Sequence, residues 1–415
     1  MKRLFIICLL PLFAFSASAQ EGLLERLISK NKAKLGAWAQ QPESYEVQVI
    51  YTQIDRDENN QPSFTTHQWR VDDTRYFYPA STVKMPAAIL ALEKLNKMGV
   101  RSLDRHTPMR NLAGTAPQTT AFVDTSAQTD LPSVGHYARK IFLVSDNDAF
   151  NRLYEFLGQN YMNERLHTKG YDHLRIIHRL SVGGFDPHGN RLTNPVQFYD
   201  AETGELLYHQ GEVYSKCYPE LGLSHEVRGK GYWDDTEKKV IQEAFDFRFK
   251  NYVSLKNLND ILKAVLFPHA IPKEQRFDLT TEDYKLLYKA MYRFPQESDY
   301  PKYAEADNHV KFWMYGNGKQ QIPKHIRIFN KVGWAYGFLS DIAYVVDFES
   351  GIEFMLSGVI HVNENEVFND GVYEYEKVGL PFFAELGQLI YDYEKGRKRT
   401  HQPDLSRFLM DASEE

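Results

Sequence analysis

The sequence of 415 residues predicts an α+β protein, with an α/β sandwich lobe formed by both ends of the chain and an all-helical lobe inserted between them. Residues 44–71 and 326–360 have the alternation and the β-rich composition of strands. Several segments within 81–292 space their apolar residues three and four apart, as helices do. With 43% hydrophobic residues, the chain can bury one large core or two small ones.

The amino-terminal part of the sheet lobe is expected to hold one helix and a β-hairpin. Gly22 to Trp38 has a helical pattern, and Ser44 to Gln53 alternates as a strand. His67 to Val71 is the second strand, and the polar run DRDENNQP supplies the turn between the two strands.

The middle of the chain is expected to be helical, and strands return near its end. Apolar spacing close to 3.6 residues predicts helices over 81–98, 133–158, 254–266 and 279–292. Strands are predicted over Ile326–Lys331, Ile342–Phe348 and Ile352–Ile360, and a closing helix from about Tyr375 to Lys395.

These elements predict one main domain and one insertion. The domain covers 20–400, with a sheet lobe at 22–75 and 322–398, a helical lobe at 76–321 and a polar tail at 401–415. Residues 183–252 contain a hairpin signal and an aromatic, charged stretch without helical periodicity, which we interpret as an insertion. Catalytic groups are expected in the cleft between the lobes.

The first nineteen residues have the pattern of a secretory signal. A basic start is followed by an apolar run and by Ala17-Ser18-Ala19, which fits the cleavage rule. The apolar run is too short to span a bilayer comfortably. We therefore expect residues 1–19 to be removed and the mature protein to be periplasmic, without stable membrane insertion.

Composition limits the partners and cofactors. Loss of Lys2 and Arg3 with the signal removes two positive charges and takes the formal net charge from −6 to −8, which argues against nucleic acid as a partner. Cys217 is then the only cysteine, so no intramolecular disulfide can form. The 14 histidines are scattered and no H-E-x-x-H occurs, so no metal or other cofactor is expected.

Ser81 and Lys84 are the first candidate catalytic residues. Three residues apart at the start of an apolar helix, they share one face. The first turn of a helix has free backbone N–H groups that can stabilise an oxyanion, and a buried lysine loses basicity and can act as a base. The pair alone is weak evidence, because Ser29 and Lys32 repeat it in a polar context.

Two further motifs follow in the chain. Ser145-Asp146-Asn147 has good helix-capping residues and also a hydroxyl and an amide suited to substrate binding. Lys331-Val332-Gly333 ends a predicted strand, where it can present a cation and bare backbone. A second copy at 377–379 lies on a predicted helix, so context separates the two.

In this order the three motifs resemble Ser-x-x-Lys, Ser-Asp-Asn and Lys-Thr-Gly of the β-lactamase and penicillin-binding serine hydrolase superfamily, class A β-lactamases most closely. The resemblance covers roughly the whole mature chain and implies a β-lactamase/transpeptidase-like fold. It implies the following roles: Ser81 as acylated nucleophile, Lys84 as base, Ser145 as proton shuttle, Asn147, Lys331 and Gly333 in substrate binding, and the backbone N–H groups of Ser81 and Trp334 as oxyanion hole.

The chain departs from the family pattern in three ways. The family's deacylating glutamate would fall near 179–181, but the segment RIIHRLSVGGFDPHGNRLTNP has no glutamate. Its acid or imidazole substitutes would be Asp186, His178 or His188. Val332 stands where the family has a hydroxyl, and the interval from Ser145 to Lys331 is lengthened by the insertion.

The expected function is a periplasmic serine hydrolase with an acyl-enzyme on Ser81, acting on a β-lactam or a related amide or ester. A D,D-peptidase, penicillin-binding protein or esterase with slow deacylation is the alternative within enzymes. A cell-envelope binding protein without turnover is the alternative from another class. The expected partner is a small acyl substrate, either a β-lactam or a peptidoglycan-like peptide.

Overall fold

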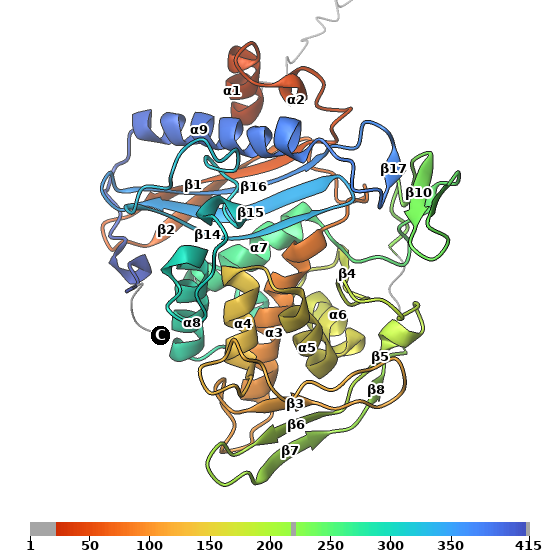
Figure 1. Cartoon of the computed structure of the whole chain (residues 1–415). Coiled ribbons are helices and arrows are strands. Elements are labelled where there is room, and N and C mark those ends of the chain that lie inside the picture. Colours follow the sequence, from red (N-terminus) through yellow and green to blue (C-terminus); the bar gives the residue numbers. More distant parts are fainter. Residues whose placement is uncertain (1–21, 217–220, 412–415) are drawn as a thin grey trace, which may run out of the picture.

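A five-stranded antiparallel sheet built from both ends of the chain is the centre of the fold (Figure 1). The computed structural model describes residues 22–216 and 221–411, so the predicted signal at 1–19 and Cys217 lie outside the described residues. The strands in spatial order are β14 (Ile326–Ala335), β15 (Phe338–Asp347), β16 (Ile352–His361), β1 (Gln48–Arg56) and β2 (Pro62–Trp69).

One face of this sheet is covered by terminal helices. In Figure 1, α9 (Leu380–Gly396) lies along the sheet, on the same side as α1 (Leu23–Asn31) and α2 (Ala37–Gln40). Phe382, Phe383, Leu386 and Ile390 form the buried face of α9, at the spacing of one helical stripe. This layer and the sheet enclose an apolar core of their own.

The opposite face carries the second lobe. Its helices are α3 (Lys84–Lys97), α4 (Val134–Leu143), α5 (Asn147–Leu157), α6 (Gln159–Thr168), α7 (Leu255–Leu266) and α8 (Thr281–Tyr292). Residues from Lys84 to Glu93 of α3 are all buried, because other elements surround this helix. The predicted α+β class is confirmed, but this lobe is not purely helical, since β3 (Met109–Asn111), β6 (Val196–Tyr199) and β7 (Leu206–Gln210) form a small sheet at its far end.

Several element boundaries differ from the sequence-based expectation. The helix expected over 22–38 is two helices, α1 and α2, and the helix expected over 133–158 breaks at Ser145, whose φ is +57°. The second strand begins at Pro62 rather than at His67, because β2 is a half-exposed edge strand with few apolar residues. The segment from 401 is no free tail, because Phe408 is buried against Phe329 and Tyr344.

The segment 183–252 consists largely of short strands beside the lobes. The structure has β4 (Leu174–Arg175), β5 (Leu192–Thr193), β8 (Val213–Tyr214), β9 (Val227–Arg228), β10 (Gly231–Asp234), β11 (Lys239–Ile241), β12 (Phe245–Asp246) and β13 (Tyr252–Val253) in and around it. β10 pairs in parallel with β17 (Val367–Phe368), which attaches this segment to the carboxy-terminal part of the chain.

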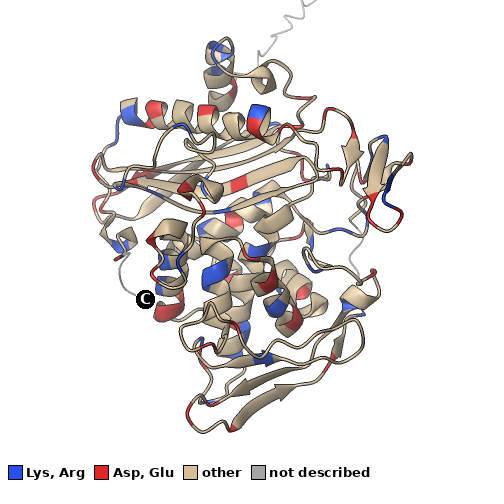
Figure 2. Ribbon diagram, viewed as in Figure 1, with Lys and Arg blue, Asp and Glu red and all other residues tan. Residues whose placement is uncertain are grey.

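The surface carries charged residues of both signs (Figure 2). Figure 2 shows acidic and basic residues interspersed over both lobes rather than gathered by sign. Within 22–216 and 221–411, no helix is both long and apolar enough to cross a membrane.

Candidate active site

A cavity of about 1140 Å³ lies where the two lobes and the 183–252 segment meet. Ser81, Ser145, Asn147 and Trp334 all line it. The structure therefore brings Ser81 together with candidates that follow it by 64 to 253 residues in the chain. Lys84 and Lys331 lie fully or almost fully buried behind these residues and reach Ser145 through hydrogen bonds.

Ser81 lies in a short 3₁₀ turn, Ala80–Val83, that leads directly into α3. Pro79 precedes this turn and Ala80 has φ +46°, so the chain bends sharply just before the serine. Ser81 is half-buried at the cavity wall, whereas Lys84, one turn later, has no exposed surface. None of the hydrogen bonds among the described residues involves the Ser81 Oγ atom, which leaves it available to an incoming carbonyl carbon.

Ser145 is presented by the break between α4 and α5. Its left-handed backbone interrupts the helical path, and the Asp146 carboxylate then caps α5 by accepting from the Ala149 N–H at 2.7 Å. Lys84 Nζ donates to the Ser145 carbonyl oxygen, to Asn147 Oδ1 at 2.6 Å and to Ser145 Oγ at 3.4 Å. One lysine thus contacts both the hydroxyl of Ser145 and the amide oxygen of Asn147.

Lys331 approaches the same hydroxyl from the sheet. Its Nζ donates to Ser145 Oγ at 2.7 Å and to the Val332 carbonyl oxygen at 2.9 Å. Burial lowers the pKa of Lys84 to about 7, and burial together with the nearby Lys84 charge holds the pKa of Lys331 well below its usual value. Near neutral pH a substantial fraction of the Lys84 amine is therefore uncharged, and this is the form that can take a proton.

Gly333 allows the sheet to approach the serine turn. A Cβ atom at this position would lie 2.5 Å from the Pro79 carbonyl oxygen and 3.0 Å from the Ser81 nitrogen. Only a residue without a side chain permits this contact, which places the strand backbone at Trp334 beside the Ser81 amide. Backbone N–H groups at these two positions are suited to hold one developing negative charge.

Val332 does not take part in the cavity. It is buried among the apolar residues that face α9. Its methyl groups extend that core and offer no hydroxyl to a bound molecule. Val332 thus lacks the hydroxyl that the family pattern has at this position and contributes buried apolar surface instead.

No glutamate lines the cavity within the part of the chain that the structure describes. The only carboxylates there are Asp146, which caps α5, and Asp235. Of the three substitutes considered from the sequence, Asp186 accepts from the Gly189 N–H at 2.6 Å and His188 packs on Tyr214, and neither lines the cavity. His178 lines it, but burial and the Lys250 charge lower its pKa to about 3, so it is a weak base.

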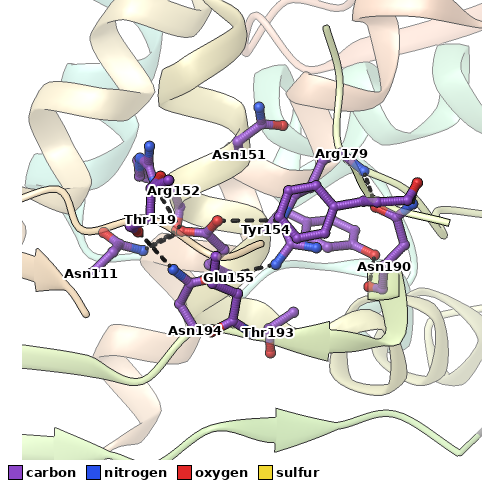
Figure 3. Close-up of polar contacts among 12 residues, drawn as sticks. Asn111, Thr119, Asn151, Arg152, Tyr154, Glu155, Arg179, Asn190, Thr193 and Asn194 are labelled. Atoms are coloured by element: carbon purple, nitrogen blue, oxygen red, sulfur yellow. Dashed lines mark hydrogen bonds and ion pairs between the residues drawn. The ribbon is translucent and has the colours of Figure 1, made fainter. Parts of the chain in front are cut away.

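The loop that lacks the glutamate is fixed by a second buried cluster, which we call the loop cluster: Asn111, Arg152, Glu155 and Arg179. Glu155 accepts from Arg179 at 3.2 Å, from Arg152 at 3.1 Å and from Asn111 at 2.9 Å (Figure 3). Arg179 also lies 4.0 Å from the centre of the Phe185 ring. Sequence reasoning missed this cluster, although a glutamate on the apolar face of α5 is the signal that could have revealed it.

The model of the β-lactamase enzyme family matches residues 25–210, which contain Ser81, Lys84, Ser145 and Asn147. No curated protein sequence matches the chain.

Solved structures similar to the chain include three examples at low identity. A β-lactamase from Chitinophaga pinensis shares 11% identity and a TM-score of 0.47, over 89% of this chain and 98% of that one. A class A β-lactamase from Clostridium kluyveri shares 14% identity with a TM-score of 0.46, over 88% of this chain and 98% of that one. The protein PBP-A shares 13% identity with a TM-score of 0.45, over 90% of this chain and 97% of that one. The family model covers 186 of the 415 residues and includes two of the three motifs, those at 81–84 and 145–147.

Proposed function

We propose, on the premise that this chain belongs to the serine β-lactamase and penicillin-binding superfamily, that it forms an acyl-enzyme on Ser81 and releases the acyl group slowly. The observation that carries the proposal is the shared hydrogen-bond network of Lys84, Ser145, Asn147 and Lys331 beside Ser81. Two lysines at one serine hydroxyl, both with lowered pKa, form a proton-transfer system rather than a stabilising ion pair.

Acylation follows from these groups. Neutral Lys84 takes the proton of the Ser81 hydroxyl while Oγ forms a bond to the substrate carbonyl carbon. The backbone N–H groups of Ser81 and Trp334 hold the resulting oxyanion. The carbon–nitrogen or carbon–oxygen bond then breaks, and the proton passes from Lys84 through Ser145 to the leaving atom.

Asn147 and Lys331 position the reactants in this scheme. The Asn147 amide oxygen is held by Lys84, and its amide nitrogen donates to Ser181 Oγ at 3.0 Å, across the cavity. A substrate amide inserted there would exchange hydrogen bonds with this side chain. Lys331 donates to the Ser145 hydroxyl and keeps it pointed at the leaving atom.

Deacylation lacks an equivalent base. Water must lose a proton as it attacks the acyl-enzyme, and no carboxylate in the cavity is free to accept it: Asp146 caps a helix, and Asp235 accepts from Trp233 and Asn369. General-base catalysis contributes about 10²- to 10⁴-fold, and without it the acyl group stays on the serine. This favours a D,D-peptidase or penicillin-binding enzyme over a fast β-lactamase.

The proposed substrates are β-lactams and related amides or esters, including peptidoglycan-like peptides, and the proposed location is the periplasm, on account of the signal pattern at 1–19. A binding protein without turnover is disfavoured by the buried lysines. Burial of two lysine side chains costs free energy, and binding alone does not require two buried lysines at one hydroxyl.

The test uses two reporters on the mature protein. A fluorescent penicillin should label the wild type but not Ser81→Ala, and the label should persist for minutes during a chase with unlabelled penicillin. A chromogenic cephalosporin should show a first colour change whose size is proportional to the enzyme concentration. Any further colour change should be slow. Fast catalytic colour change would overturn the slow-deacylation proposal, and absence of label with every acyl donor would overturn the acyl-enzyme itself.

A further inference from the structure

The cavity continues past the reacting serine into a compartment that we call the acyl pocket, walled by Tyr78, His178, Phe249, Lys250 and Tyr336. Along β14, Lys331 lies at the leaving-group side and Trp334 at the oxyanion. Tyr336 lies two residues after Trp334, in the turn that joins β14 to β15, and so on the other side of Trp334 from Lys331 along the chain. This end of the cavity therefore receives the acyl part of a substrate, not its leaving group.

Aromatic rings form the walls of the acyl pocket. The Tyr78 ring stacks on His178 with centroids 6.1 Å apart and meets the Tyr336 ring edge-on at 5.1 Å. Tyr78 is three residues before Ser81, so these rings adjoin the nucleophile directly. Flat or ring-bearing acyl groups fit such walls, because aromatic faces pack well against one another.

Lys250 contributes a cation to this aromatic wall. Its Nζ lies 5.9 Å from the centre of the Tyr336 ring and 5.8 Å from that of Phe245. Among the described residues, no carboxylate pairs with it, and burial lowers its pKa. An anion bound beside it would restore the charged form that burial disfavours.

The other polar groups of the pocket leave room for an anion. Asp235 is 74% exposed by side chain, and its oxygens already accept from Trp233 at 3.1 Å and from Asn369 at 3.4 Å. The His178 Nδ1–H donates to the Arg179 carbonyl oxygen, which leaves a neutral, buried Nε2 without a partner in the described structure. This imidazole is neutral and therefore does not compete with Lys250 as a cation for a bound anion.

We propose that the acyl pocket selects substrates whose acyl side chain carries a carboxylate, which pairs with Lys250. This inference rests on the proposed acyl-enzyme function and adds the substrate class. Lys250 belongs to the 183–252 segment, so the segment supplies a specificity residue that the three motifs do not contain. A charge-assisted hydrogen bond of this kind corresponds to about a ten- to hundredfold preference.

Benzylpenicillin and its α-carboxylated analogue carbenicillin are matched probes, because they differ by one carboxylate on the acyl side chain. We expect the ratio of their second-order acylation rates, carbenicillin over benzylpenicillin, to fall about ten- to hundredfold in Lys250→Met and to be largely kept in Lys250→Arg. Lys230→Met, at an exposed lysine of the same segment, should keep the wild-type ratio. Equal ratios in the wild type and Lys250→Met would overturn the inference.

A binding measurement separates failure of this inference from failure of the proposed function. If neither penicillin acylates Ser81, calorimetry on Ser81→Ala with phenylmalonate and with phenylacetate still tests the pocket without chemistry. Tighter binding of phenylmalonate, lost when Lys250→Met is added, supports the inference. Equal affinities for the two compounds, or a preference that survives Lys250→Met, would overturn it.

Discussion

Two buried polar clusters, one within the second lobe and one between that lobe and the sheet, use similar side chains for different purposes. In the loop cluster, the Glu155 carboxylate pairs with Arg152 and Arg179. In the active-site network, Lys84 and Lys331 share Ser145 Oγ, and no carboxylate bonds to either of them in the described structure. Matched charges fix a loop, whereas unmatched cations lose basicity and become able to move protons.

Replacing Lys84, the proposed base, should have the largest effect on the contrast between the two clusters. Lys84→Met should lower the rate of acylation by about 10²- to 10⁴-fold, because Ser81 loses its proton acceptor. The free energy of unfolding should fall by about 1–3 kcal/mol, since Met fills the volume of Lys84 but leaves the Ser145 carbonyl oxygen and Asn147 Oδ1 without their donor. Stopped-flow or gel-based penicillin labelling measures the first quantity and calorimetry the second.

Helix α3 offers a matched control for that variant. Lys94 is one of its residues, burial likewise lowers its pKa to about 7, and it donates to Phe156 and Gln210 outside the cavity. Lys94→Met should acylate at the wild-type rate per folded molecule. An equal loss in both variants would show that Lys84 acts through stability rather than as a base.

Removing the balancing charge of the loop cluster should act on stability instead. Glu155→Gln leaves the Arg179 guanidinium buried without its carboxylate, and we expect a loss of about 3 kcal/mol in the free energy of unfolding. Urea denaturation measures it. Glu164→Gln on the exposed face of α6 should change stability by less than about 0.5 kcal/mol, and a similar small effect at Glu155 would contradict the structural role.

Adding a carboxylate near the serine should sharpen the contrast between acylation and deacylation. Ser181 lines the cavity, and its Oγ accepts from Asn147 at 3.0 Å, so a longer acidic side chain there reaches the acyl-enzyme. Ser181→Glu should shorten the lifetime of the penicillin adduct by about ten- to hundredfold. Ser181→Gln, of the same length but without basicity, should not. Equal lifetimes in the two variants would exclude a missing base as the cause of slow release.

The smallest expected effect is that of pH. Lys84 must be neutral to accept the serine proton, and its pKa is lowered to about 7. Below that value the neutral fraction falls about tenfold per pH unit, so the acylation rate should rise about tenfold from pH 5 to pH 6 and level off above pH 8. Rates that are flat from pH 5 to pH 8 would contradict a base with this pKa.

Local patterns in the sequence predicted the candidate residues that line the cavity, and contacts between distant segments determine the rest of the site. Helical spacing places Ser81 and Lys84 on one face, and this could be predicted. The apolar period of residues 133–158 runs through Ser145 and hides the break, whereas the capping residues Ser145-Asp146-Asn147 indicated a helix start there. The pattern of α5 alone does not distinguish Glu155 from other charged helix residues, because its partner Arg179 comes from the loop at 176–194. Lys250 is positioned by the packing of the 183–252 segment against Tyr336, just after β14.

The most direct test of the central claim is the lifetime and location of the acyl group. Rapid-quench intact mass spectrometry with benzylpenicillin should show one adduct per chain that forms quickly, persists for minutes and maps to the peptide containing Ser81. An adduct that remains in Ser81→Ala, or one that turns over as fast as it forms, would contradict an acyl-enzyme built by the Lys84–Ser145–Lys331 network without a deacylating base.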